Sequence, residues 1–132
     1  MILLDANVFI AFENKEDVHH QRAQEIFEGI DAGKLGKAFT TDYVFNEVIG
    51  VIYRKRGKER ATAFGDYMRA SVCIFVVDEH ILSESWDFFK KTKLTLNFVD
   101  CTIVTVAGIT NAISIATFDK EFSKVENINV TI

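Results

Sequence analysis

The N-terminal residues 1–10 constrain the fold more than any other stretch. Ile2, Leu3 and Leu4 form an uninterrupted apolar run that leads directly into Asp5. A short run without polar alternation predicts a strand buried on both faces, as in the middle of a parallel sheet. Asp5 then stands at the carboxyl end of that strand, where ligand crevices form in open α/β sheets. Because no Lys or Arg adjoins Asp5 in sequence, we expect its partner to be a divalent metal ion.

Length and composition bound the class of protein. The 132 residues, of which 48% are hydrophobic, predict one domain over residues 1–132 with a sizeable core. The net charge of −4 means that any RNA binding must use a local basic patch or metal ions. No apolar run reaches the length of a membrane span, so we expect a soluble, cytoplasmic protein with no membrane partner. Cys73 and Cys101 form no C-x-x-C motif, which predicts buried free thiols in a reducing compartment.

Apolar runs alternate with segments of helical periodicity along the chain. The runs predict strands at 1–4, 38–40, 72–77, 112–116 and 128–132. The periodicity predicts helices at 18–30, 43–56, 58–70 and 79–92, with a short helix or turn at 6–12 and a helical turn at 120–123. This alternation predicts a three-layer α/β/α sandwich with a central parallel sheet.

The segment 98–109 is ambiguous on its own. Its β-branched residues favour a strand, whereas Asp100 as an N-cap and Gly108 as a terminator favour a helix. We predict a helix, because a parallel sheet needs a crossover before the next strand.

Several side chains are expected to face the interior. In the helix 43–56, which Thr41 or Asp42 can cap, the inward residues are Val44, Val48 and Ile52. In the helix 79–92, which Asp78 caps, the inward residues are Ile81, Leu82, Ser85, Trp86 and Phe89. Trp86 and the phenylalanines are therefore interpreted as core or dimer contacts, and His19, His20 and His80 as surface residues.

Acidic residues occupy comparable places along the predicted sheet. Asp5 and Asp119 follow strands, Asp100 begins a helix, and Glu47 lies one turn into the helix after the second strand. Four carboxylates in one crevice would repel one another and raise one another's pKa. Mg²⁺ or Mn²⁺, which prefer oxygen ligands, would remove that cost and could activate water beside a phosphate. The alternatives are that Asp100 is only an N-cap and that Asp119 only ends a strand.

The densest basic run lies at the end of the helix 43–56. Its residues are Arg54, Lys55, Arg56, Lys58 and Arg60. Cations are favourable at a helix C-terminus, so a solvated helix end explains the run without any function. The functional alternative is a rim where Arg54, Lys55, Arg56 and Lys58 contact RNA phosphates.

Four short stretches resemble a known family. They are Leu4–Ile10, Thr41–Val48, Phe98–Ile103 and Ile115–Phe122, and they follow one another over nearly the whole chain. In them the chain resembles the PIN-domain family, and most of all the short ribonuclease toxins of the VapC type. The resemblance implies a parallel sheet with helices on both faces. It also implies that Asp5, Glu47, Asp100 and Asp119 are catalytic and metal-binding, with Asn7 and Thr117 in support. Asn97 departs from the family in a minor way, since a small hydroxyl residue is common there.

The same resemblance implies an activity and partners. It implies a Mg²⁺- or Mn²⁺-dependent endoribonuclease that cleaves single-stranded RNA to 5′-phosphate and 3′-hydroxyl ends. It further implies the toxin of a type II toxin–antitoxin pair, an antitoxin partner, and a homodimer formed through residues 64–86. The alternatives are a housekeeping PIN-domain RNA-processing nuclease and a non-catalytic RNA-binding subunit. A third alternative is a receiver- or phosphatase-like domain phosphorylated on Asp5 or Asp78, for which Lys120 is the nearest available lysine.

Overall fold

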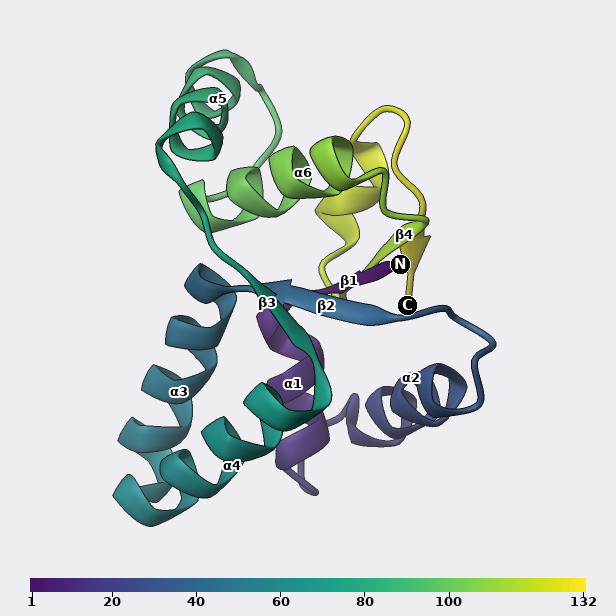
Figure 1. Ribbon diagram of the computed structural model, residues 1–132, viewed down its shortest axis with the longest axis vertical. Helices are drawn as coiled ribbons and strands as arrows, with labels where there is room; N and C mark the ends of the chain where they lie inside the picture. The colour runs from purple at the N-terminus through teal and green to yellow at the C-terminus, as the bar shows by residue number, and fades with distance from the viewer.

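The computed structural model describes residues 1–132 and contains one five-stranded sheet with helices on both faces (Figure 1). The strands are β1 (Ile2–Leu4), β2 (Ala38–Thr41), β3 (Cys73–Phe75), β4 (Ser114–Ala116) and β5 (Val130–Thr131). The helices are α1 (Ala6–Glu13), α2 (His20–Asp31), α3 (Asp42–Arg56), α4 (Lys58–Ser71), α5 (Glu79–Lys91) and α6 (Phe98–Thr110), with a 3₁₀ helix η1 (Lys120–Lys124).

All strand pairs are parallel, in the order β3-β2-β1-β4-β5. The helices α1 to α4 cover one face of the sheet, and α5 and α6 cover the other (Figure 1). The predicted three-layer α/β/α sandwich with a central parallel sheet is therefore confirmed. β1 is the middle strand, and Ile2, Leu3 and Leu4 are fully buried, as expected for a strand covered on both faces.

The parallel arrangement brings the carboxyl ends of β1, β2 and β4 to one edge of the sheet. α1 begins directly after β1, and α3 begins directly after β2. The hydroxyl of Thr40 donates to the carbonyl oxygen of Leu4 at 2.8 Å, which fastens the ends of β1 and β2 together. The N-terminal ends of α3 and α6 lie at the same end of the sheet (Figure 1).

The ambiguous segment is a helix, as predicted, although eight of the residues in α6 are β-branched. Its two ends explain this result. The side chain of Asn97 caps the first turn, and Asn111 closes the last turn in the left-handed conformation with φ of 51°. Cys101, Ile103 and Val106 are buried in the hydrophobic core, so packing stabilises the helix in addition to its caps.

Some boundaries differ from the sequence predictions. The strands β3 and β4 are shorter than predicted, with three residues each. The helix α2 begins at His20 and not at Val18, which lies in a turn with 91% of its surface exposed. Cys101 is buried, but Cys73 is exposed on the edge strand β3, so the prediction of two buried thiols is wrong for Cys73. No helix is both long and apolar enough to pass through a bilayer.

The interior face of α5 is narrower than predicted. Ile81 and Ser85 are buried, four residues apart, whereas Trp86 and Phe89 are 50% and 38% exposed. Both aromatic residues sit on the next face of the helix, where they contact each other and Phe98 rather than the core. The prediction that Trp86 and Phe89 face the interior is therefore wrong, and the alternative of a dimer contact for Trp86 stays a prediction.

Candidate functional site

Asp5 and Thr117 are neighbours across the two central strands. Leu4 pairs with Ala116, so the next residue along each strand emerges at the same edge. The Thr117 hydroxyl donates to Oδ2 of Asp5 at 2.7 Å, and the Ala6 N–H donates to Oδ1 at 2.7 Å. The Asp5 side chain, which is only 6% exposed, is thus held at both oxygens and caps α1.

Thr117 connects Asp5 to the following loop. Its hydroxyl oxygen accepts hydrogen bonds from Nδ2 of Asn7 and from the Asp119 N–H, both at 3.1 Å. Oδ1 of Asn7 in turn accepts from the Phe118 N–H at 3.1 Å. Asn7 and Thr117 therefore hold the Asp5 carboxylate and the Asp119 backbone in one network. Their support of a metal site stays a prediction.

Asp100 is the third residue of α6 and not its N-cap, so that part of the sequence interpretation is wrong. Asn97 is the cap, and its Oδ1 accepts from the Asp100 N–H at 2.8 Å. Oδ2 of Asp100 accepts from the Asn97 N–H at 2.9 Å, which completes a capping box. Ser, Thr and Asn all cap helices well, so the departure at Asn97 preserves the local structure.

Asp119 and Glu47 complete the acidic cluster, a name we use for Asp5, Glu47, Asp100 and Asp119. Oδ1 of Asp119 accepts from the Glu121 N–H at 2.9 Å and caps η1. Glu47 is exposed on α3, between the buried residues Val44 and Val48 on neighbouring turns.

The acidic side chains influence one another electrostatically. Burial raises the pKa of Asp5 to about 7, with smaller contributions from the charges of Asp100 and Glu47. Burial also raises the pKa of Asp100, with smaller contributions from the charges of Asp119 and Glu47. No Lys or Arg forms an ion pair with any member of the acidic cluster. Its negative charge is therefore uncompensated within the chain.

The donor set of the acidic cluster fits a hard divalent cation. All four side chains offer carboxylate oxygens, which Mg²⁺ and Mn²⁺ prefer. No three His, Cys, Asp or Glu side chains anywhere in the chain form a ready-made group for a metal ion. A metal ion bound here would therefore need water ligands in addition to those from the protein.

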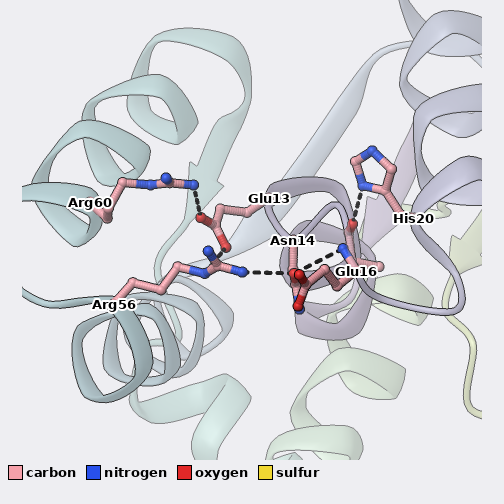
Figure 2. Close-up of polar contacts among 7 residues, drawn as sticks. Glu13, Asn14, Glu16, His20, Arg56 and Arg60 are labelled. Atoms are coloured by element: carbon pink, nitrogen blue, oxygen red, sulfur yellow. Dashed lines mark hydrogen bonds and ion pairs between the residues drawn. The ribbon is translucent and has the colours of Figure 1, made fainter.

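The basic run lies at the other end of α3. Arg54, Lys55 and Arg56 follow Glu47 by seven to nine residues, which places them roughly 10–14 Å further along α3, and Lys58 begins α4. Arg56 and Arg60 both pair with Glu13, whose side chain is 6% exposed, and Arg56 also donates to Oδ1 of Asn14 at 2.7 Å (Figure 2). Arg56 and Arg60 therefore join α1 to α3 and α4.

The remaining basic residues of the run are free of such contacts. Arg54, Lys55 and Lys58 are exposed and form no ion pair. Lys58 also borders a cavity of about 490 Å³ between α3 and α4, which includes no member of the acidic cluster. The predicted RNA-contacting rim is thus separate from the edge of the sheet at which Asp5 and Asp119 lie.

His19 is a residue near the site that sequence reasoning missed. Its imidazole stacks on the ring of Phe118, with centroids 4.3 Å apart and an interplanar angle of 10°. Phe118 lies between Thr117 and Asp119 in the chain, so the stack is next in sequence to two residues of the network around Asp5. No spacing in the sequence indicates this contact, because the two rings are 99 residues apart along the chain.

Comparisons with known proteins agree with this geometry. The family model described as the PIN domain matches residues 2–128. No curated protein sequence matches the chain.

Solved structures share the fold at low sequence identity. The VapC20 toxin of Mycobacterium tuberculosis, described as cleaving the sarcin–ricin loop, is 22% identical, with a TM-score of 0.85 and full coverage of both chains. VapBC2 of Rickettsia felis bound to promoter DNA is 18% identical, with a TM-score of 0.75 over 99% of this chain and 98% of the other. DNA-bound VapBC of Salmonella typhimurium is 16% identical, with a TM-score of 0.73 over 98% and 96%.

Proposed function

Because the chain belongs to the PIN-domain family, we propose that it is a metal-dependent endoribonuclease that cleaves single-stranded RNA. The observation that carries this proposal is the buried Asp5 carboxylate, which has no cation partner and lies within the influence of Glu47 and Asp100. A buried carboxylate left without a positive partner is costly, and a bound cation is the usual remedy. VapC20, which has the same fold, is described as cleaving an RNA loop.

Asp5, Asp100 and Asp119 would hold Mg²⁺ or Mn²⁺, and Glu47 would hold the ion or orient the attacking water. The bound ion would activate that water and neutralise charge on the phosphodiester. Thr117 fixes one oxygen of Asp5, and the capping box leaves Oδ1 of Asp100 without a hydrogen bond from the protein. Glu47 is exposed and can accept a proton from water.

The chemistry of the products follows from water as the nucleophile. Water oxygen would form a bond to phosphorus in line with the P–O3′ bond, which breaks. The leaving oxygen takes a proton, which gives a 3′-hydroxyl and a 5′-phosphate.

The test of this activity uses single-stranded RNA labelled at its 5′ end. We expect cleavage with Mg²⁺ or Mn²⁺ and none with excess EDTA. The downstream products should ligate without prior phosphorylation, because they would carry 5′-phosphates. Cleavage that persists in EDTA, or products with 2′,3′-cyclic phosphates, would contradict the proposal.

The biological setting that we propose is the toxin of a type II pair. The support is that two of the similar structures are complexes named VapBC. A housekeeping RNA-processing nuclease is the alternative, and it would have no antitoxin. A toxin should have a small protein encoded beside it, whose co-expression inhibits cleavage and gives a stable complex. Unchanged cleavage by the co-expressed pair would favour the housekeeping role.

We also propose a two-fold symmetric homodimer formed through residues 64–86. Its support is the large apolar surface that this part of the chain leaves exposed: Tyr67, Val76 and Trp86 are each more than a third exposed. Light scattering at tens of micromolar should give twice the chain mass of 15.0 kDa. A mass of one chain under these conditions would exclude the dimer.

A further inference from the structure

The two rings of the His19–Phe118 stack differ in their exposure to solvent. Phe118 is half-buried and packs against the hydrophobic core, whereas His19 is exposed. The rings are nearly parallel, with an interplanar angle of 10°. One face of the imidazole therefore covers Phe118, and the opposite face is turned outward.

Hydrogen bonds fix the backbone on both sides of the stack. The His19 N–H donates to Oδ1 of Asp17 at 2.8 Å, and the His20 N–H donates to the carbonyl oxygen of Asp17 at 3.0 Å. Nδ1 of His20 lies 2.7 Å from the carbonyl oxygen of Ala11, which ties the start of α2 to α1 (Figure 2).

On the other side of the stack, the Phe118 N–H donates to Oδ1 of Asn7 at 3.1 Å. The stack thus belongs to the same network that fixes Asp5. The backbone of Phe118 is tied to Asp5 through the side chains of Asn7 and Thr117, and the imidazole of His19 is positioned by its stack on Phe118.

An RNA strand needs contacts near the acidic cluster that do not depend on its phosphates. The cluster carries uncompensated negative charge, and the unpaired basic residues of the run lie at the far end of α3. Stacking on an aromatic face meets this need, because every base has a flat apolar face and an unpaired strand exposes it.

We propose that the His19–Phe118 stack is a nucleobase platform, on which one unpaired base beside the cleaved phosphodiester stacks against the open face of His19. This inference rests on the proposed ribonuclease function and adds a substrate-binding residue to it. It predicts that the aromatic face of residue 19 matters, and not its charge.

The first test measures cleavage of one RNA with abasic positions placed in turn on either side of the cleaved bond. In the wild type, one abasic position should lower kcat/KM about tenfold, the effect expected for loss of one stacked base. His19→Ala should lower kcat/KM by a similar factor on intact RNA and show no further loss at that abasic position. His19→Phe should keep most of the wild-type value, and His80→Ala, an exposed histidine on α5, should equal the wild type.

The second test reads stacking directly and does not depend on cleavage. In a Glu47→Gln background, RNA with 2-aminopurine at the identified position should lose fluorescence on binding, and His19→Ala should abolish that quenching.

Each failure has a distinct meaning. Equal kcat/KM for His19→Ala and the wild type, or additive losses from His19→Ala and the abasic site, would overturn the platform. A loss in His19→Phe as large as in His19→Ala would also overturn it, because the imidazole would then act through charge or a hydrogen bond. If the wild-type protein cleaves no RNA, but quenches 2-aminopurine placed in the same RNA and loses that quenching in His19→Ala, the proposed function is overturned and the platform is retained.

Discussion

At the scale of single residues, the site depends on how Asp5 is held. Its carboxylate is buried beside two other acids, yet both of its oxygens accept hydrogen bonds. The hydrogen bonds favour the charged form and burial opposes it, and burial is the larger effect. In the absence of metal, Asp5 therefore lowers the stability of the fold at neutral pH.

The sign of this effect fixes its pH dependence. The pKa of Asp5 is about 7 in the folded chain, against a reference value of 3.8. Between these values the folded state binds a proton that the unfolded state has lost, so stability falls as the pH rises from about 4 to about 7. The difference between these two pKa values corresponds to a loss of roughly 4 kcal/mol in the free energy of unfolding above pH 7.

Asp5→Asn removes this penalty and one hydrogen bond. The Thr117 hydroxyl already accepts two N–H groups and gives its only proton to Asp5, so an amide nitrogen placed there finds no acceptor. Without metal we expect Asp5→Asn to be more stable than the wild type by on the order of 2 kcal/mol at pH 8, and less stable by about 1 kcal/mol at pH 4. Urea denaturation at both pH values measures this. The same difference at both pH values would mean that Asp5 does not titrate as stated.

Thr117 offers a second prediction at this scale. Thr117→Val removes one donor to Asp5 and leaves the Asp119 N–H without its acceptor. The variant should lose about 1–3 kcal/mol of stability, and its cleavage rate should fall roughly 10–100-fold. Thr117→Ser, which keeps the hydroxyl, is the matched control and should stay close to the wild type. A fully active Thr117→Val would show that the network does not position the acids.

At the scale of elements, the ends of helices place the chemistry. Asp5, Asn97 and Asp119 cap α1, α6 and η1, so the residues that begin helices also border the site. Sequence patterns predicted these elements well, because apolar periodicity and capping residues are local signals. They assigned the N-cap of α6 to Asp100, whereas Asn97 is the N-cap. Asp and Asn both cap helices, so the pattern does not distinguish the two positions.

Contacts between distant elements were beyond the reach of the sequence. The stack of His19 on Phe118 and the pairing of Arg56 with Glu13 depend on how α1, α2 and the β4–η1 connection are packed. Trp86 shows the same limit, because its helical phase falls at the border of the buried face, where tertiary packing decides exposure.

The pairing of Arg56 gives a prediction for the basic run. Arg56→Ala leaves the buried Glu13 with one cation instead of two and removes the bond to Asn14, so it should reduce stability by about 1–2 kcal/mol.

Lys58→Ala should change stability by less than about 0.5 kcal/mol. If the run contacts RNA, Lys58→Ala should weaken RNA binding and reduce its dependence on salt. Thermal melts measure the stability of both variants, and filter binding at two salt concentrations measures their RNA affinity. An unchanged melting temperature for Arg56→Ala would contradict the stabilising role of Arg56.

At the scale of the whole molecule, a chain with net charge −4 folds around a concentration of negative charge at one edge of its sheet. A cation that binds only the folded chain must stabilise all of it. Mn²⁺ at about one hundred times its Kd should add about 2.7 kcal/mol, which corresponds to a rise in Tm of roughly 5–10 °C. Asp119→Asn should reduce that rise. A Tm that does not respond to Mn²⁺ would exclude the metal site.

The most direct measurement of the central claim is the initial rate of RNA cleavage by two matched variants. Asp100→Asn removes one charge from the acidic cluster, whereas Asp78→Asn removes one charge from a residue that only caps α5, where Asn serves equally well. The account predicts that Asp100→Asn lowers the rate at least about 100-fold and that Asp78→Asn stays within about twofold of the wild type. Equal rates for Asp100→Asn and the wild type, from proteins purified identically, would show that the acidic cluster does not perform the cleavage.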